Sequence, residues 1–100
     1  MYDRLADYVL SKPGLYLARQ YKHMLKKEFS EKMLEKYKQE LLEMAKITAS
    51  RSIYREWVSI LREMFIFEGG ETVVESIVRE WREKYKNRPA MMQELGMLGM

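Results

Sequence analysis

The chain has 100 residues, of which 47% are hydrophobic and 33% charged, and its formal net charge is +3. This length suits one domain around one core. The absence of cysteine excludes disulfide bonds and thiolate metal sites. No apolar run approaches the ~20 residues that span a bilayer. The N-terminal segment resembles neither a signal peptide nor a transit peptide, so we expect a cytoplasmic location.

Residues that favour helices dominate the composition, while β-branched residues are few. Leu, Met, Glu, Lys, Arg and Ala lose little side-chain freedom in a helix. The sequence therefore predicts one all-α domain over residues 1–100, either an antiparallel helical bundle or a degenerate helical-repeat-like stack of about five to six helices. Residues do not match at a fixed period of roughly 34 to 47, so no repeat signature accompanies the helices.

The first part of the chain predicts two helices, from about Tyr2 to Leu10 and from about Leu15 to Lys27. Pro13 forbids continuation of the first helix, and Gly14 tolerates a positive φ in the turn that follows. Ser30 then marks a boundary, because its hydroxyl can accept hydrogen bonds from the free amides of the next helical turn.

The middle of the chain predicts a third helix over about residues 31–47 and a fourth over residues 51–65, separated by the short break Ile-Thr-Ala-Ser. The fourth helix has the clearest pattern, because its apolar residues recur at steps that place them on one face. These residues are Tyr54, Trp57, Val58, Leu61, Met64 and Phe65.

The segment Phe-Glu-Gly-Gly-Glu at residues 67–71 predicts a tight turn into a fifth helix that begins at Glu71. Acidic residues favour the N-terminal end of a helix because they complement its dipole. We predict that the fourth and fifth helices form an antiparallel pair, in which Trp57 of one helix faces Trp81 of the other.

The fifth helix ends before Pro89, since the residue preceding a proline is pushed out of the α region. Pro89 suits the first turn of a short sixth helix, where its missing amide costs nothing. This helix carries Met91, Met92 and Leu95, which can fold back over the end of the core. We therefore predict a lid over the core at this end of the chain.

The helix at residues 51–65, the glycine turn and the closing run Arg-Pro-Ala-Met-Met-Gln-Glu-Leu at residues 88–95 resemble the C-terminal helical region of bacterial SWIM-zinc-finger family proteins. The resemblance covers about residues 37–95. It implies paired, stacked helices and a chain that is a C-terminal fragment or a stand-alone relative, because the Cys-x-Cys and Cys-x-His zinc ligands are absent. No functional residue carries over, since the binding role of the family resides in the missing module.

Basic residues gather on the second predicted helix, and four of them lie along one strip at steps of three and four. Such a strip can follow the phosphates of a nucleic acid, or it can be an ordinary solvated face. The candidate nucleic-acid contacts are Arg19, Lys22, His23, Lys26 and Lys27.

Methionines crowd the end of the chain, and methionine marks adaptable binding surfaces as well as irregular cores. The candidate partner surface consists of Met91, Met92, Leu95 and Met97. It would receive a protein partner or a second copy of the chain, and simple core packing is the alternative.

No nucleophile, base and orienting group can be assembled from these residues, so we do not expect an enzyme. The sequence implies no metal, cofactor, small-molecule substrate or membrane partner. The function we predict is a non-catalytic helical protein-interaction or scaffolding domain. The alternative is a nucleic-acid-binding helical domain that uses the basic strip.

Overall fold

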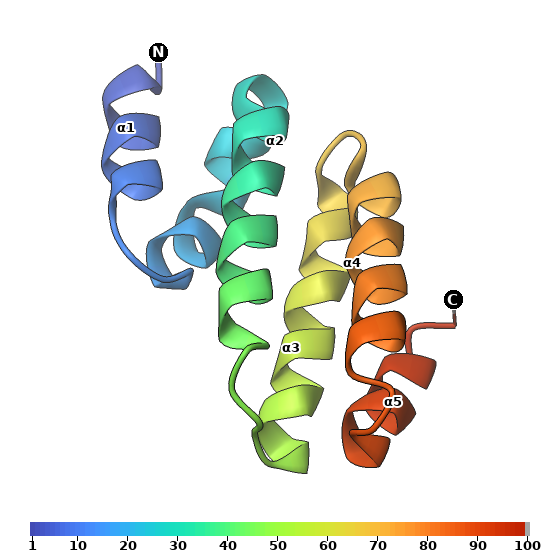
Figure 1. The fold of residues 1–100 in the computed structure, drawn as a ribbon. Coiled ribbons are helices and arrows are strands. Elements are labelled where there is room, and N and C mark those ends of the chain that lie inside the picture. Colours follow the sequence, from blue (N-terminus) through green and yellow to red (C-terminus); the bar gives the residue numbers. More distant parts are fainter. Residues whose placement is uncertain (100) are drawn as a thin grey trace.

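The computed structural model describes residues 1–99, and these residues are all-helical without a strand. The helices form an elongated body of 44 × 23 × 19 Å (Figure 1). Within residues 1–99, no helix has both the length and the apolar character needed to cross a membrane. The predicted all-α class is confirmed. The elements are α1 (Asp3–Ser11), α2 (Tyr16–Met44), α3 (Arg51–Glu63), the 3-10 turn η1 (Met64–Ile66), α4 (Gly70–Lys84) and α5 (Pro89–Gly96).

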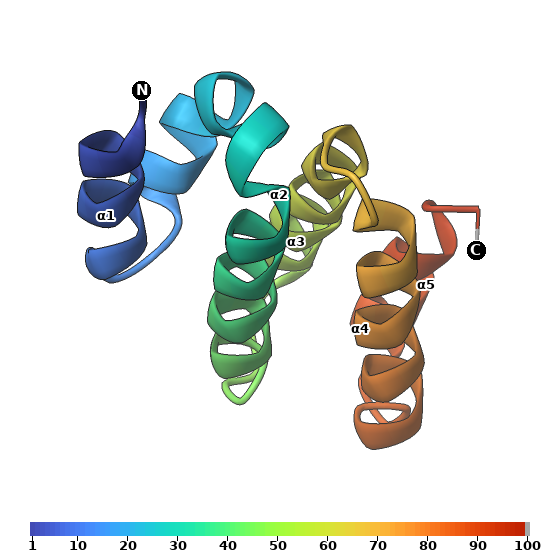
Figure 2. The same ribbon diagram turned by 90° about the horizontal axis from the view of Figure 1, so that it is seen from above.

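Helix α2 folds back on itself at Phe29, whose φ of −121° and ψ of 23° are not helical. A straight helix would separate residues 14 and 40 by about 39 Å. Instead, the backbone N–H of Gly14 donates to Glu40 Oε2 at 3.1 Å. Residues 16–28, here the N-terminal arm, and residues 30–44, here the C-terminal arm, therefore lie side by side (Figures 1 and 2).

Ser30 lies at the predicted boundary, but its predicted role is wrong. Its hydroxyl does not cap the following turn; it donates to the backbone carbonyl of Lys26, four residues earlier. Back-bonding of this kind bends helices, because the hydroxyl competes with the backbone amide for the same carbonyl. The same oxygen accepts from the backbone N–H of Glu68 at 3.2 Å, which ties the bend to the turn before α4.

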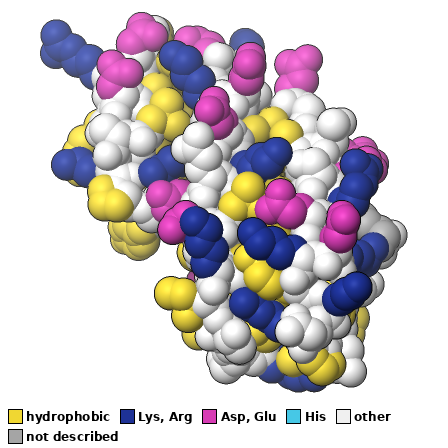
Figure 3. All heavy atoms as spheres, in the orientation of Figure 1, with side chains coloured by type: hydrophobic (Ala, Val, Ile, Leu, Met, Phe, Trp, Pro, Cys, Tyr) yellow, Lys and Arg dark blue, Asp and Glu magenta, His cyan; other side chains and the backbone are white. Residues whose placement is uncertain are grey.

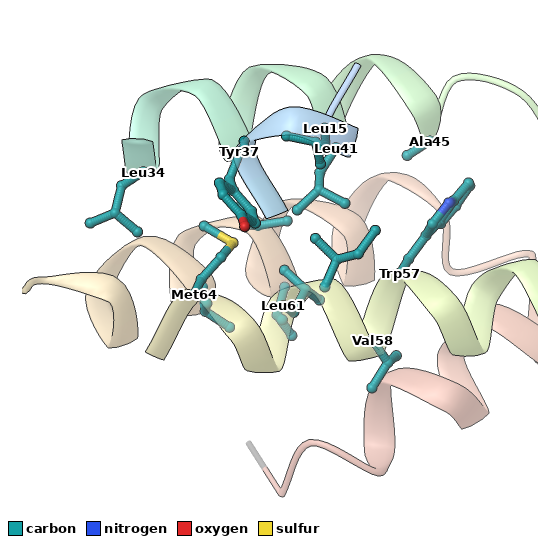
Figure 4. Close-up of a cluster of buried hydrophobic side chains, with 14 of the residues drawn as sticks. Leu15, Leu34, Tyr37, Leu41, Ala45, Trp57, Val58, Leu61 and Met64 are labelled. Carbon is teal, nitrogen blue, oxygen red and sulfur yellow. The ribbon is translucent and has the colours of Figure 1, made fainter. Parts of the chain in front are cut away.

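The core lies where both arms of α2 meet α3 and α4. Leu15, at the start of the N-terminal arm, points into the same cluster as Leu41 from the C-terminal arm (Figure 4). The predicted facing of two tryptophans is confirmed, because the rings of Trp57 and Trp81 lie 5.7 Å apart. Bulky rings between two helices hold their backbones apart while still excluding water.

Phe65 departs from the predicted buried stripe and is 42% exposed. The reason is local, because α3 ends at Glu63 and continues as η1. A 3-10 turn has 3.0 residues per turn in place of 3.6, so side chains beyond Glu63 leave the face that the α-helix defined. Met64 is still fully buried, whereas Phe65 rotates towards the surface.

Two glycines make the turn between η1 and α4. Gly69 has a φ of +81°, the left-handed region that glycine enters without a steric cost. Gly70 begins α4, one residue before the predicted start, and a Cβ there would lie 1.9 Å from the carbonyl oxygen of Met64. A side chain at Gly70 is therefore incompatible with the backbone as it stands.

Helix α5 begins at Pro89 and packs against α3. Met91 and Leu95 are each 1% exposed, so this short helix closes the end of the core as the sequence predicted.

Candidate functional site

A groove of about 570 Å³ lies between the N-terminal arm of α2 and helix α3. Its apolar part includes Leu15 and Ile60, which are buried, and Met44, which is half-buried. Tyr16 stands at its rim with 79% of its surface exposed. The remaining lining residues are polar or charged: Arg19, Gln20, Lys22, Glu56 and Glu63.

The charged residues of the groove are paired with one another, and Glu63 is the central partner. Arg19 donates to the Glu63 carboxylate through Nη2 at 2.6 Å and through Nε at 3.0 Å. Lys22 Nζ lies 3.4 Å from Glu63 Oε1, and Arg19 Nη1 lies 3.3 Å from Glu56 Oε1. Two cations and two carboxylates therefore compensate one another along the groove.

The same carboxylate is reached from the core by Tyr37, whose hydroxyl donates to Glu63 Oε1 at 3.5 Å. Tyr37 is fully buried. Burial raises the pKa of Tyr37, and the charge of Glu63 raises it further, so the hydroxyl stays protonated and acts as a donor. We call Arg19, Lys22, Tyr37, Glu56 and Glu63 together the Glu63 cluster.

The Glu63 carboxylate is held in its charged form by its neighbours. Burial alone would raise the pKa of Glu63, but the hydrogen bonds and charges of Arg19 and Lys22 outweigh burial and lower the pKa below its ordinary value of 4.5. The hydrogen bond to Glu63 raises the pKa of Arg19 in turn. The arrangement suits a structural tie between α2 and α3 rather than proton transfer, which is fastest for a group that titrates near the working pH.

The structure splits the predicted basic strip into two parts. Arg19 and Lys22 are committed to Glu63, so their charges are already compensated. His23, Lys26 and Lys27 are exposed, and no side-chain ion pair of these three forms within residues 1–99. Basic and acidic side chains are interspersed on the face shown in Figure 3, without a broad patch of one sign.

The predicted methionine surface is largely part of the core. Met91 and Leu95 are 1% exposed and cannot contact a partner in this conformation, because α5 presses them against α3. This half of the prediction is therefore corrected. Met92 is half-buried, and Met97 is 68% exposed.

The closing motif at residues 88–95 has a structural explanation. Glu94 is 6% exposed and pairs with Arg51 Nη1 at 3.0 Å and Arg55 Nε at 3.4 Å, a set we call the Glu94 clamp. Arg88 lies 4.1 Å from the ring centre of Tyr85 and donates to the carbonyl of Ala45 at 2.7 Å. The charged residues of the motif thus hold α5 in place.

Sequence reasoning missed Glu63 and the apolar part of the groove. A signal for both exists in α3, because Ile53, Glu56, Ile60 and Glu63 follow one another at steps of three, four and three. That spacing places two isoleucines and two glutamates on one helix face, outside the stripe that contains Trp57. A helix face that alternates apolar and acidic residues predicts a partly buried surface. Its carboxylates then need cations from the element that packs against them.

Within residues 1–99, no three His, Asp or Glu side chains come together as a metal site would require. No family model, no curated protein and no solved structure matches this chain. The groove, with its exposed tyrosine, is thus the candidate site on geometry alone.

Proposed function

We propose that this chain is a non-catalytic protein-interaction domain and that the groove between the N-terminal arm of α2 and α3 receives the partner. The observation that supports this most directly is Tyr16, whose side chain is 79% exposed beside the buried residues Leu15 and Ile60. Tyrosine is one of the side chains that dominate the energy of protein interfaces, because it offers a large rigid surface with one polar end.

The internal pairing of the groove supports the same proposal. A free charge would attract ions or charged ligands, whereas the charges of Arg19, Lys22, Glu56 and Glu63 already compensate one another. What the groove still offers to a partner is the exposed ring of Tyr16 and the half-buried Met44 beside polar residues, and an apolar centre with a polar rim is the usual anatomy of a protein interface.

The finer architecture belongs to this proposal. We propose a stack of antiparallel helix pairs, formed by α1 with the N-terminal arm and by α3 with α4, with α5 packed on α3 at the end of the stack. The resemblance to SWIM-zinc-finger proteins and a cytoplasmic location remain part of the proposal, and the closing motif at residues 88–95 supports the resemblance.

Photo-crosslinking tests the proposal at the groove. Tyr16 is replaced by a photoreactive phenylalanine analogue, and crosslinked products from cells that produce the protein are identified by mass spectrometry. The matched control carries the same analogue at Tyr8, which is 50% exposed on α1. We expect a defined protein adduct from position 16 and none from position 8, and equal or absent adducts at both would contradict the proposal.

A second function, nucleic-acid binding, is favoured by Lys26 and Lys27, which are exposed and form no ion pair within residues 1–99. Fluorescence anisotropy of labelled single- and double-stranded DNA at low and physiological salt tests it. A binder should lose affinity steeply with salt and lose binding when both lysines become glutamate. The charge-matched control changes Lys84 and Lys86 instead, and flat titrations of the unmodified protein would exclude this function.

A further inference from the structure

Helix α2 bends at a point where its sequence favours a straight helix. Residues 15–68 contain neither glycine nor proline, and residues 24–34, around the bend, read Met-Leu-Lys-Lys-Glu-Phe-Ser-Glu-Lys-Met-Leu. Most of these residues favour a helix, and apart from the hydroxyl of Ser30 none of them is a usual cause of a sharp bend. Local preference and tertiary structure therefore disagree at this one place.

The bent helix and a straight helix differ mainly at one residue. Phe29 has a φ of −121° and a ψ of 23°, whereas an α-helix needs about −63° and about −42°. A rotation of about 60° about each of two backbone bonds thus converts one form into the other. The straight form would be a single helix over Tyr16–Met44 with a length of about 44 Å.

Polar contacts hold the bent form closed. They join residues 1–28, here the N-terminal hairpin, to residues 30–99, here the body, and each joins a residue before Phe29 to a residue after it. The pairs are Arg19 with Glu63, Lys22 with Glu63, Gly14 with Glu40, and Lys12 with Lys36.

The N-terminal hairpin also carries apolar side chains that cannot stay uncovered. Val9, Leu15 and Leu25 are all buried and belong to the same core cluster as the apolar residues of the body. A chain with a straight α2 would move these side chains away from its own body and expose both surfaces to water, which favours association.

A second copy with a straight α2 exposes the same two surfaces. The N-terminal hairpin of each copy then fits the body of the other through the contacts that now form within one chain, so no new interface has to be built. We infer that this chain exchanges its N-terminal hairpin with a second copy by straightening α2 at Phe29. The occupant is a second copy because the chain's own hairpin already shows the fit (Figure 2).

This inference does not rest on the proposed function. In the exchanged dimer, the N-terminal arm of one copy lies on α3 of the other, so the groove is formed again between two chains. A partner could bind it in either form.

Paired charge reversals test the exchange. Arg19→Glu and Glu63→Arg each place two like charges together in the unexchanged protein, and in a dimer of either variant with itself. A dimer of one variant with the other restores an opposite pair at both sites. We expect two copies to associate about 100-fold more strongly in the mixture than in either variant alone, because a hydrogen bond between charged groups is worth about tenfold or more at each site.

The two variants are unfolded in urea, refolded together and examined by sedimentation velocity and native mass spectrometry. The matched control mixes Arg51→Glu with Glu94→Arg, whose side chains form an ion pair within the body. Exchange of the N-terminal hairpin leaves this pair within one chain, so the control mixture should associate no more than its components. Circular dichroism follows folding, and a variant that folds only in the mixture also supports the inference. A test mixture that stays monomeric, or a control mixture that dimerises equally, would overturn it.

A second test acts at the bend itself. Ser30→Ala removes the hydroxyl that donates to the carbonyl of Lys26 and accepts from the N–H of Glu68, so straightening becomes easier. We expect the dimer association constant to rise about tenfold after refolding. The control is Ser76→Ala, which removes a bond from a hydroxyl to the carbonyl of Val73 within α4. An equal effect of the two substitutions would show that the bend is not the point of exchange.

Discussion

The Glu63 cluster and the Glu94 clamp are built from the same kind of ion pair, but the residues around them differ in exposure. In both, a mostly buried glutamate on one helix is held by two cations from another helix. Around Glu94 the apolar neighbours are covered, since Met91 and Leu95 are 1% exposed. Beside Glu63 the surface stays open, and Tyr16 remains 79% exposed.

The difference shows how one type of interaction can either complete a core or border a surface. The Glu94 clamp seals α5 over α3, and Met91 and Leu95 beneath it are covered. The Glu63 cluster ties the N-terminal arm to α3 at the edge of the core, where Tyr16 remains exposed. Charge pairing therefore lies inside a closed region in one place and beside an exposed tyrosine in the other.

The largest effect should come from the turn between η1 and α4. In Gly70→Ala, the new Cβ would lie 1.9 Å from the Met64 carbonyl oxygen, so the backbone must move. We expect a loss of about 4 kcal/mol in the free energy of unfolding, measured by urea titration. Gly96→Ala is the control, because no atom lies within 4 Å of its new Cβ, and it should change stability by less than about 1 kcal/mol. Equal effects at the two sites would contradict the prediction.

An intermediate effect should separate a buried carboxylate from an exposed one. Glu94→Gln weakens both arginine contacts of the clamp and should cost about 2 kcal/mol, because hydrogen bonds to charged groups are lost in a covered site. Glu56→Gln also removes one arginine contact, but this side chain is 59% exposed, so the cost should stay below about 0.5 kcal/mol. Urea titrations of both variants measure the loss in the free energy of unfolding. A larger loss for Glu56→Gln than for Glu94→Gln would contradict the prediction.

The smallest expected effect is the pH dependence of stability that Glu63, in the groove, causes. The folded-state pKa of Glu63 lies below its ordinary value of 4.5, so its contribution to stability is fully present above about pH 4.5 and is lost as the pH falls through the lowered pKa. Glu63→Gln removes this contribution. The difference in unfolding free energy between the unmodified protein and Glu63→Gln should therefore be largest near neutral pH and shrink in acid. A difference that stays constant from about pH 7 to pH 3 would show that Glu63 does not titrate as proposed.

Much of the fold was predictable, because it follows from local patterns. The facing of Trp57 and Trp81 follows from two apolar stripes and a short glycine turn. The position of the bend followed from Ser30, although the partner of its hydroxyl did not. A serine can bond forwards as a cap or backwards to a carbonyl, and the packing of the two arms decides between them.

The candidate site was less predictable, because it depends on distant pairs. Arg19 and Glu63 are 44 positions apart, and they meet only because the chain folds back at Phe29 and returns the N-terminal arm to α3. No local pattern encodes that direction. The burial of Met91 likewise depends on where α5 docks, so composition alone suggested a surface that the fold covers.

The contact between Trp57 and Trp81 determines what fluorescence can report about this molecule. The sequence holds two tryptophans, and both lie in this single contact 5.7 Å apart. Intrinsic emission will therefore follow the docking of α4 on α3, whereas α1 and the N-terminal arm contain no tryptophan. If the N-terminal region opens on its own, the change will be nearly silent in emission, and amide hydrogen exchange is the method that would detect it.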